Sequence, residues 1–199
     1  MDLRFLVQKC RIGSEQVIGM VALRDALLVV DMQVALFEDG SRYDAAGLVH
    51  RLNNLSRRVR ASGGQVIFVR HTEQVGAFQP GGPGWQLLPE LEVVEQDTII
   101  NKSTCDCFAA TELASILPVG ATRRLVVGGC ATEFCVDTTV RSAAVHGYDV
   151  WAPQDGHTTA DREHLTAEQV IQHHNFVWSN FIGSRGAINI TPAAEIFCD

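Results

Sequence analysis

A cysteine near the start of a predicted helix is the residue of this sequence best suited to nucleophilic chemistry. The apolar run 125–127 leads through Gly128 and Gly129 into a segment whose apolar residues have helical spacing. This pattern predicts a buried strand that turns sharply into a helix, with Cys135 in the first helical turns. The helix dipole and the unpaired backbone N–H groups there favour a thiolate, which would make Cys135 a nucleophile. The alternative is that Cys135 is a small buried core residue.

Two further reactive side chains follow other predicted strands. The apolar run 26–30 ends at Asp31, and the run 98–100 is followed closely by Lys102. Because parallel strands of an open α/β sheet present their carboxyl ends at one edge, these two residues and Cys135 are expected to share one crevice. The carboxylate can accept the thiol proton and later protonate a leaving amine, while the ammonium holds negative charge in place. Taken singly, Asp31 could cap a helix and Lys102 could be a surface cation.

Strand and helix patterns alternate along the chain from residue 25 onward. The alternation predicts an α/β fold, a three-layer α/β/α arrangement around a six-stranded, mostly parallel Rossmann-like sheet. We expect residues 25–199 to form one domain, preceded by an N-terminal extension over residues 1–24 that has no clear periodicity. Strands are predicted at 26–30, 65–70, 98–100, 125–127, 148–152 and 187–190, and helices at 43–61, 108–117, from about 135 to Gly147 and from 166 to 174.

The length, composition and net charge of the chain limit the classes of partner that it could bind. With 199 residues, 46% of them hydrophobic, the chain can bury one substantial core. A formal net charge of -7 and no basic run with interleaved aromatics argue against a nucleic-acid partner and favour a small-molecule substrate. No signal-peptide pattern and no apolar run of about 18 residues are present, so we expect a cytoplasmic protein that does not interact with a membrane.

The six cysteines show neither a zinc-site spacing nor a disulfide framework. Cys105 and Cys107 are the one close pair, and we expect them to be structural rather than redox-active. The long glycine- and proline-rich loop after the second strand is typical of a functional loop. Its Trp85 either lines a substrate pocket or anchors the loop to the core. His157, in the loop after the fifth strand, could also reach the crevice.

Four motifs of this chain resemble the isochorismatase-like cysteine hydrolase superfamily, over roughly residues 25–190. The resemblance implies a catalytic triad in which Asp31 is the base, Lys102 the electrostatic support and Cys135 the nucleophile. The motifs that carry it are LLVVDMQ at 27–33, Asn101 with Lys102, VGGCATEFCV at 127–136, and Ala143, Ala144 with Gly147, Tyr148.

The resemblance also implies a cis peptide bond between Cys130 and Ala131. Its use would be to aim the N–H groups of Ala131 and Cys135 at a carbonyl oxygen, as an oxyanion hole. Nicotinamidases of this superfamily add an Asp-x-His metal motif after the second strand, whereas here His71 is followed by Thr72 and Glu73. We therefore expect neither a catalytic metal nor any other cofactor.

These observations predict a cysteine-dependent hydrolase of a small amide or ureido C–N bond, acting through a thioester intermediate. Gln33, Phe37, Trp85 and Phe134 are predicted to contact the substrate, and the resemblance implies a homo-oligomer, a dimer or a tetramer. One alternative is an isochorismate-type vinyl ether hydrolase in which Asp31 acts alone, which thiol alkylation would not inhibit. Another is a non-catalytic binding protein on the same fold, in which the thiol pKa would be ordinary.

Overall fold

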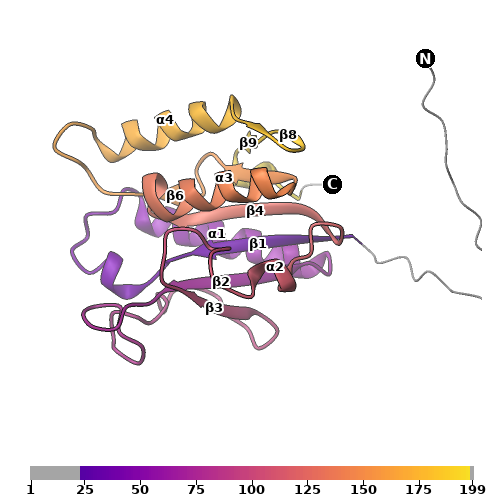
Figure 1. The fold of residues 1–199 in the computed structure, drawn as a ribbon. Coiled ribbons are helices and arrows are strands. Elements are labelled where there is room, and N and C mark those ends of the chain that lie inside the picture. The colour runs from indigo at the N-terminus through magenta and orange to yellow at the C-terminus, as the bar shows by residue number, and fades with distance from the viewer. Residues whose placement is uncertain (1–22, 198–199) are drawn as a thin grey trace, which may run out of the picture.

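The computed structural model describes residues 23–197 (Figure 1). The predicted extension, residues 1–24, therefore lies almost entirely outside the described residues. Within residues 23–197, no helix combines the length and the hydrophobicity needed to cross a membrane. The elements of the sheet and its covering helices are β1 Arg24–Val30, α1 Ala45–Ala61, β2 Gln65–His71, β3 Thr98–Lys102, α2 Leu113–Ile116, β4 Thr122–Cys130, α3 Asp137–His146, β5 Val150–Pro153, β6 His157–Thr158, α4 Ala167–Ser179 and β9 Asn189–Thr191.

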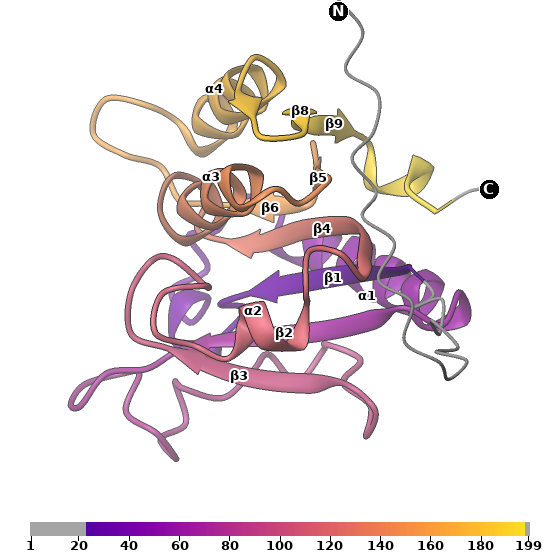
Figure 2. The same cartoon turned by 45° about the vertical axis from the view of Figure 1, so that its right-hand side comes forward.

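The described strands form a parallel sheet in the order β3-β2-β1-β4-β5-β9, with the short β6 pairing to β4. In Figure 2 this order runs from β3 at the bottom to β9 near the top. A separate antiparallel hairpin joins β7, Ile182–Gly183, to β8, Gly186–Ala187. The predicted six-stranded parallel sheet is thus confirmed, with β6 as an added seventh strand.

The central strand β1 is buried on both faces, and alternate residues contribute to two cores. Leu28 and Val30 belong to a cluster that includes Trp178 of α4 and residues of α3. Leu27 and Val29 belong to a second cluster with the apolar face of α1. Figure 1 shows α1 behind the sheet and α2 and α3 in front of it. This is the predicted three-layer α/β/α arrangement, and it explains why the run 26–30 is apolar at every position.

The predicted helix over 108–117 is wrong in extent, because only Leu113–Ile116 is helical. Side chains bind the backbone groups that a longer helix would have paired. Thr111 Oγ1 donates to the Cys107 carbonyl at 2.6 Å and accepts from Leu113 N at 3.2 Å. Ala110 also has a φ of 55°, in the left-handed region that interrupts a right-handed helix.

Two helix boundaries in the second half, the end of α3 and the start of α4, follow the sequence closely. Gly147 ends α3 with a φ of 91°, as its type predicts. The capping box that starts α4 is present: Gln169 N donates to Thr166 Oγ1 at 3.2 Å, and Thr166 N donates to Gln169 Oε1 at 2.9 Å. The helix itself continues to Ser179, five residues beyond the predicted end.

Candidate active site

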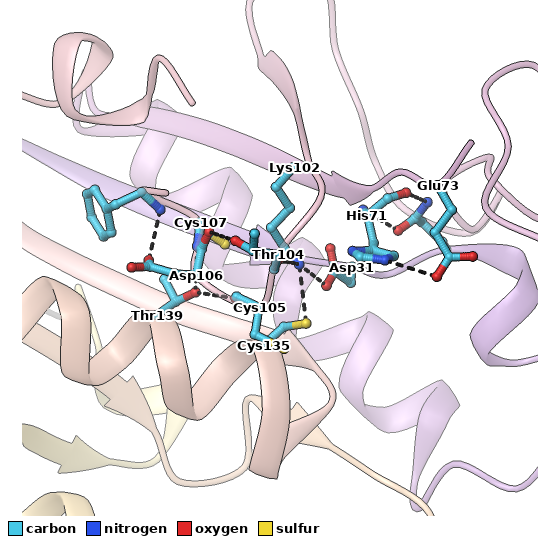
Figure 3. A network of polar contacts seen from close by, with 12 residues as sticks. Asp31, His71, Glu73, Lys102, Thr104, Cys105, Asp106, Cys107, Cys135 and Thr139 are labelled. Atoms are coloured by element: carbon cyan, nitrogen blue, oxygen red, sulfur yellow. Dashed lines mark hydrogen bonds and ion pairs between the residues drawn. The ribbon is translucent and has the colours of Figure 1, made fainter. Parts of the chain in front are cut away.

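A thiol, a carboxylate and an ammonium meet at the carboxyl edge of the sheet (Figure 3). Lys102 Nζ donates to Asp31 Oδ2 at 2.6 Å and to Cys135 Sγ at 3.2 Å. Its third hydrogen bond, of 3.0 Å, goes to the Thr104 carbonyl, so all three ammonium protons have an acceptor. The three side chains predicted to converge are therefore brought together.

Each member of this cluster comes from the end of a different strand. Asp31 directly follows β1 and takes a φ of 48°, an uncommon conformation for a residue with a side chain. Lys102 is the last residue of β3, two strands away, a separation of about 10 Å that only a long side chain can cross. Cys135 lies in a π-helical turn, Thr132–Val136, between β4 and α3.

Two glycines let β4 approach its neighbours closely enough to position that turn. Gly129 has a φ of 131°, and a Cβ atom there would overlap the backbone of Val30 on β1. A Cβ atom on Gly128 would overlap the Gly156 carbonyl and touch Leu52. The Gly-Gly pair is therefore required by packing immediately before the residues that carry the thiol.

The electrostatics of the cluster favour a neutral thiol in the resting protein. Burial raises the pKa of Cys135, the negative charge of Asp31 raises it further, and Lys102 only partly opposes these effects. For Lys102, burial is the largest single effect and lowers the pKa, but the charge of Asp31, its hydrogen bond to the ammonium and the nearby Cys107 and Cys135 together raise the pKa, so the ammonium form is stabilised. The predicted stabilisation of a thiolate by the helix dipole is therefore opposed by Asp31, because that thiolate would be a second anion beside this carboxylate.

One oxygen of the carboxylate is left ready for a proton. Asp31 Oδ1 is buried and, among the described residues, has no hydrogen-bond partner, while Oδ2 holds Lys102. A buried carboxylate oxygen without a donor is costly unless the site uses it. Moving the Cys135 proton to Asp31 leaves the total charge of the cluster unchanged, with the thiolate then paired to Lys102.

The cluster opens into a cavity of about 380 Å³. The reactive residues Asp31 and Cys135 line it together with apolar, thiol and charged side chains. The lining residues are Asp31, Leu36, Arg42, His71, Glu73, Phe78, Cys105, Cys130, Ala131, Phe134, Cys135 and Arg162.

Of the four predicted substrate contacts, Phe134 lines this cavity and the other three do not. Gln33 is fully buried and joins β2 to the long loop: its amide donates to the carbonyls of His71 and Trp85, both at 3.0 Å, and accepts from His71 N at 2.7 Å. Phe37 lines a separate apolar hollow beside α1. Gln33 and Phe37 therefore lie outside the residues that line this cavity, and their contact with a substrate stays a prediction.

Trp85 anchors the long loop, which is one of the two roles that the sequence allowed, the other being to line a substrate pocket. Its indole N–H donates to Thr72 Oγ1 at 3.0 Å, and the Arg70 guanidinium lies 3.6 Å from the ring centroid. The cation–π contact and the hydrogen bond tie the loop to the end of β2.

His157 does not line the cavity but supports the turn that carries the thiol. Its Nδ1 lies 2.9 Å from Thr132 Oγ1 and its Nε2 lies 3.1 Å from Asn175 Oδ1. Burial lowers the pKa of His157 to about 4, so the ring is neutral at pH 7. The ring therefore joins β6, α4 and the first residue of the π-helical turn.

The peptide bond between Cys130 and Ala131 is cis, as predicted. Ala131 and Cys135, the two residues assigned to an oxyanion hole, line the same cavity. Within residues 23–197, no group of three or more His, Cys, Asp or Glu side chains is arranged to hold a metal ion. His71 and Glu73 do approach each other, with 3.4 Å between Nε2 and Oε1.

Several cavity residues carry no sequence signal that would have revealed them. Arg42 and Arg162 lie in loops far apart in the chain, and only the folded structure brings both to one cavity. The Cys105 and Cys107 pair separates: Cys105 lines the cavity, while Cys107 is buried in the core and burial raises its pKa to about 12. Residues 103–105 form a bend after β3, so the two side chains do not share a face as residues two apart in an extended strand would.

Together, a doubly wound parallel sheet and a Cys–Asp–Lys cluster at its carboxyl edge define an α/β protein with a cysteine-based candidate active site. Comparison with known proteins extends this assignment to a family. The Isochorismatase domain family model matches residues 25–177, and the chain belongs to the isochorismatase family.

Similarity to individual proteins supports the assignment to this family. A streptothricin hydrolase from Streptomyces noursei is 35% identical over 138 residues, 68% of this chain and 55% of the relative. A ureidoacrylate amidohydrolase RutB from Stutzerimonas stutzeri is 28% identical over 162 residues, 62% of this chain and 65% of the relative. The crystal structure of an isochorismatase family protein aligns with a TM-score of 0.75 at 32% identity, covering 83% of this chain and 96% of that one. The chain thus spans about half the length of the streptothricin hydrolase that it matches.

Proposed function

We propose that this protein hydrolyses the C–N bond of a small amide or ureido compound through a thioester on Cys135. The observation that carries this proposal is the contact of one buried ammonium with both the thiol and the carboxylate, at 3.2 Å and 2.6 Å. A nucleophile, a proton carrier and a charge-stabilising group then stand within reach of one bound carbonyl group.

In the first half-reaction, the Cys135 proton moves to Asp31 Oδ1 as the sulfur attacks the carbonyl carbon. Lys102 pairs with the thiolate, and the N–H groups of Ala131 and Cys135 receive the developing oxyanion. The tetrahedral intermediate collapses as the C–N bond breaks, and Asp31 returns the proton to the leaving nitrogen. The products of this step are a free amine or ammonia and a thioester.

In the second half-reaction, Asp31 takes a proton from a water molecule that attacks the thioester carbonyl. The C–S bond breaks, the acid is released, and the proton returns to the Cys135 sulfur. The carboxylate thus serves as base and as acid alternately, which suits a group with one oxygen held by Lys102 and the other unpartnered.

The relatives support the chemical class of this proposal. One is named a streptothricin hydrolase and another a ureidoacrylate amidohydrolase. Cys135 additionally favours attack on an acyl carbon over the acid-catalysed cleavage of a vinyl ether, since ether cleavage by Asp31 alone needs no nucleophile.

The decisive variant is Cys135→Ala, measured by ammonia or amine release from a panel of small amides and ureido compounds. We expect loss of turnover to the background rate with an unchanged circular dichroism spectrum. Cys105→Ala is the matched control because it removes a second thiol from the same cavity. Amide hydrolysis by Cys135→Ala at the wild-type rate would exclude the thioester mechanism, and ether hydrolysis by that variant would favour the alternative in which Asp31 acts alone.

We also propose that the protein forms a homo-oligomer in the cytoplasm. Exposed apolar side chains support self-association, among them Val145 at 63%, Phe176 at 67% and Ile182 at 90% exposure. The four cysteines within residues 23–197 are free thiols, which suits a reducing compartment. Light scattering coupled to size-exclusion chromatography should give twice or four times the 21.7 kDa chain mass, and a monomer mass would contradict the proposal.

A further inference from the structure

Arg42 lines the cavity and forms no ion pair with another residue of the described part of the chain. Two arginines, Arg42 and Arg162, line the cavity, and the Lys102 ammonium contacts Cys135, another lining residue. Lys102 is neutralised by Asp31. Arg162 is neutralised by Glu133, with 2.5 Å between Nη2 and Oε1. Among residues 23–197, Arg42 takes part in no ion pair, and neither of its Nη atoms makes a hydrogen bond.

Arg42 is nevertheless held firmly in place. Its Nε donates to the Leu36 carbonyl at 2.7 Å, which fixes the plane of the guanidinium and leaves the two Nη groups available. The next residue, Tyr43, is clamped at both ends: its N–H donates to the Thr159 carbonyl at 2.9 Å, and its carbonyl accepts from Thr158 Oγ1 at 2.6 Å. These hydrogen bonds hold the Arg42 guanidinium in position without a bound ligand.

Two nearby acidic groups form no ion pair with this arginine. Hydrogen bonds with Ser41 and also the charge of Arg42 lower the pKa of Asp39, on the same turn, but Asp39 is fully exposed and accepts its hydrogen bond of 3.0 Å from Ser41 N. Glu73, on the cavity wall, approaches His71 instead. The charge of Arg42 is felt within the cavity: burial raises the pKa of Cys130 to about 12, and Arg42 is the leading influence that opposes this rise.

From this geometry we infer that Arg42 is a specificity-determining residue that binds an anionic group of the ligand, a carboxylate in the simplest case. This inference about the substrate rests on the proposed function. Taken together, the two describe the substrate as a small amide or ureido compound that carries a carboxylate. A guanidinium with Nε already occupied offers two Nη groups to such an anion, and a partly buried site strengthens the pairing.

The test uses two alkylating reagents of nearly equal size, iodoacetate and iodoacetamide. Both react by the same step, in which the Cys135 thiolate displaces iodide and forms a C–S bond. Both rates are proportional to the fraction of Cys135 that is present as thiolate. Their ratio at one pH is therefore independent of that fraction and reports the preference of the cavity for an anion. Mass spectrometry of the Cys135 peptide separates this reaction from alkylation of Cys105.

We expect Arg42→Gln to lower the iodoacetate-to-iodoacetamide ratio by about tenfold, as expected for the loss of one charge pair at partial burial. Arg42→Lys should retain most of the ratio because it keeps the charge. Arg185→Gln is the matched control, since it removes an exposed arginine of the β7–β8 hairpin. An unchanged ratio in Arg42→Gln, or a loss of equal size in Arg42→Lys with an unchanged fold, overturns the inference.

A second readout addresses the substrate itself. For an amide with a terminal carboxylate and its methyl ester, the wild-type protein should favour the acid in kcat/KM, and Arg42→Gln should lose this preference mainly through KM. If amides of both kinds are hydrolysed without such a preference, the inference about the substrate fails while the proposed function stands. If no amide is hydrolysed, the proposed function fails and the alkylation ratio still decides the role of Arg42.

Discussion

At the residue scale, the chemistry of the candidate site depends on how buried Asp31, buried Lys102 and partly buried Cys135 share one negative charge, one positive charge and one transferable proton. With Asp31 ionised and Lys102 protonated, a Cys135 thiolate would add a second negative charge to a buried cluster. The raised pKa of Cys135 follows from this. The thiol becomes nucleophilic when its proton moves to Asp31, so activation is coupled to the approach of a carbonyl group rather than stored in the resting protein.

This arrangement predicts opposite effects of Asp31→Asn on two reactions of the same sulfur. The substitution removes the charge that raises the pKa of Cys135 and leaves Lys102 to stabilise the thiolate. Alkylation by iodoacetamide at pH 7 should become about tenfold faster, because a lower pKa means more thiolate. Hydrolysis should fall at least about 100-fold, because the proton carrier is lost.

The control is Asp39→Asn, which removes a fully exposed carboxylate near the cavity and should change neither rate. The measurements are a pH series of alkylation rates and initial rates of product release. Slower alkylation in Asp31→Asn would contradict the account of the raised pKa. Undiminished hydrolysis would contradict the role of Asp31 as the proton carrier.

Sequence reasoning located the reactive residues, but three of the four expected substrate contacts do not line the cavity. Asp31, Lys102 and Cys135 follow strands whose order and direction the apolar runs predict, so their convergence is a consequence of topology. The partners of Gln33 and Trp85 belong to a loop whose path has no periodic signal. Side chains that bind a loop can therefore be assigned only after the loop has folded.

At the element scale, the transition from β4 to α3 is the feature that positions the thiol. β4 pairs with β1 so closely at Gly129 that no side chain fits between the strands. Two residues of the turn are held by side chains outside it: Glu133 pairs with Arg162, and Thr132 contacts His157. The π-helical turn is thus tied to other parts of the fold.

Gly129→Ala should accordingly be much more damaging than an ordinary glycine substitution. The new Cβ would overlap the Val30 backbone, and the φ of 131° would be strained for alanine. We expect the free energy of unfolding to fall by about 3 kcal/mol or more. Gly120→Ala is the control, because Gly120 has open space around its Cβ position and no left-handed φ. Equal urea midpoints for the two variants would show that close packing at Gly129 is unimportant.

The elements themselves were predictable to different degrees. Long apolar runs such as 26–30 identified the six main strands, whereas β6 has two residues and is too short for any periodicity. The segment 108–112 has helix-compatible residues but uses the Thr111 hydroxyl to satisfy the backbone instead. Local patterns detect elements that pack on the core, and side-chain hydrogen bonds decide where such elements end.

At the scale of the whole molecule, two buried charge-sensitive groups connect distant parts of the chain. His157 joins β6 to α4 and to the turn before α3, and it is held neutral by burial. Asp25, at the start of β1, pairs with Arg123 and Arg124 of β4. For Asp25, burial raises the pKa, but the hydrogen bonds and charges of the two arginines lower it to about 2.

These groups predict that acid destabilises the protein in two separate ranges of pH. The pKa of His157 falls from 6.5 to about 4 on folding, so its contribution is intact above pH 6.5 and is lost as the pH falls to about 4. The loss is about 3 kcal/mol. The pKa of Asp25 falls from 3.8 to about 2, so its contribution disappears only below about pH 4.

His157→Gln should abolish the acid destabilisation between pH 6.5 and about 4 and keep the destabilisation below about pH 4. The absolute stability of this variant will be lower, because the bonds to Thr132 and Asn175 change, but the slope of unfolding free energy between pH 6.5 and 4 should flatten. His164→Gln, at an exposed position, is the matched control and should keep the wild-type slope. Urea unfolding at a series of pH values measures both variants. A wild-type slope that persists in His157→Gln would place the acid-sensitive group elsewhere, since the ring that titrates would no longer be present.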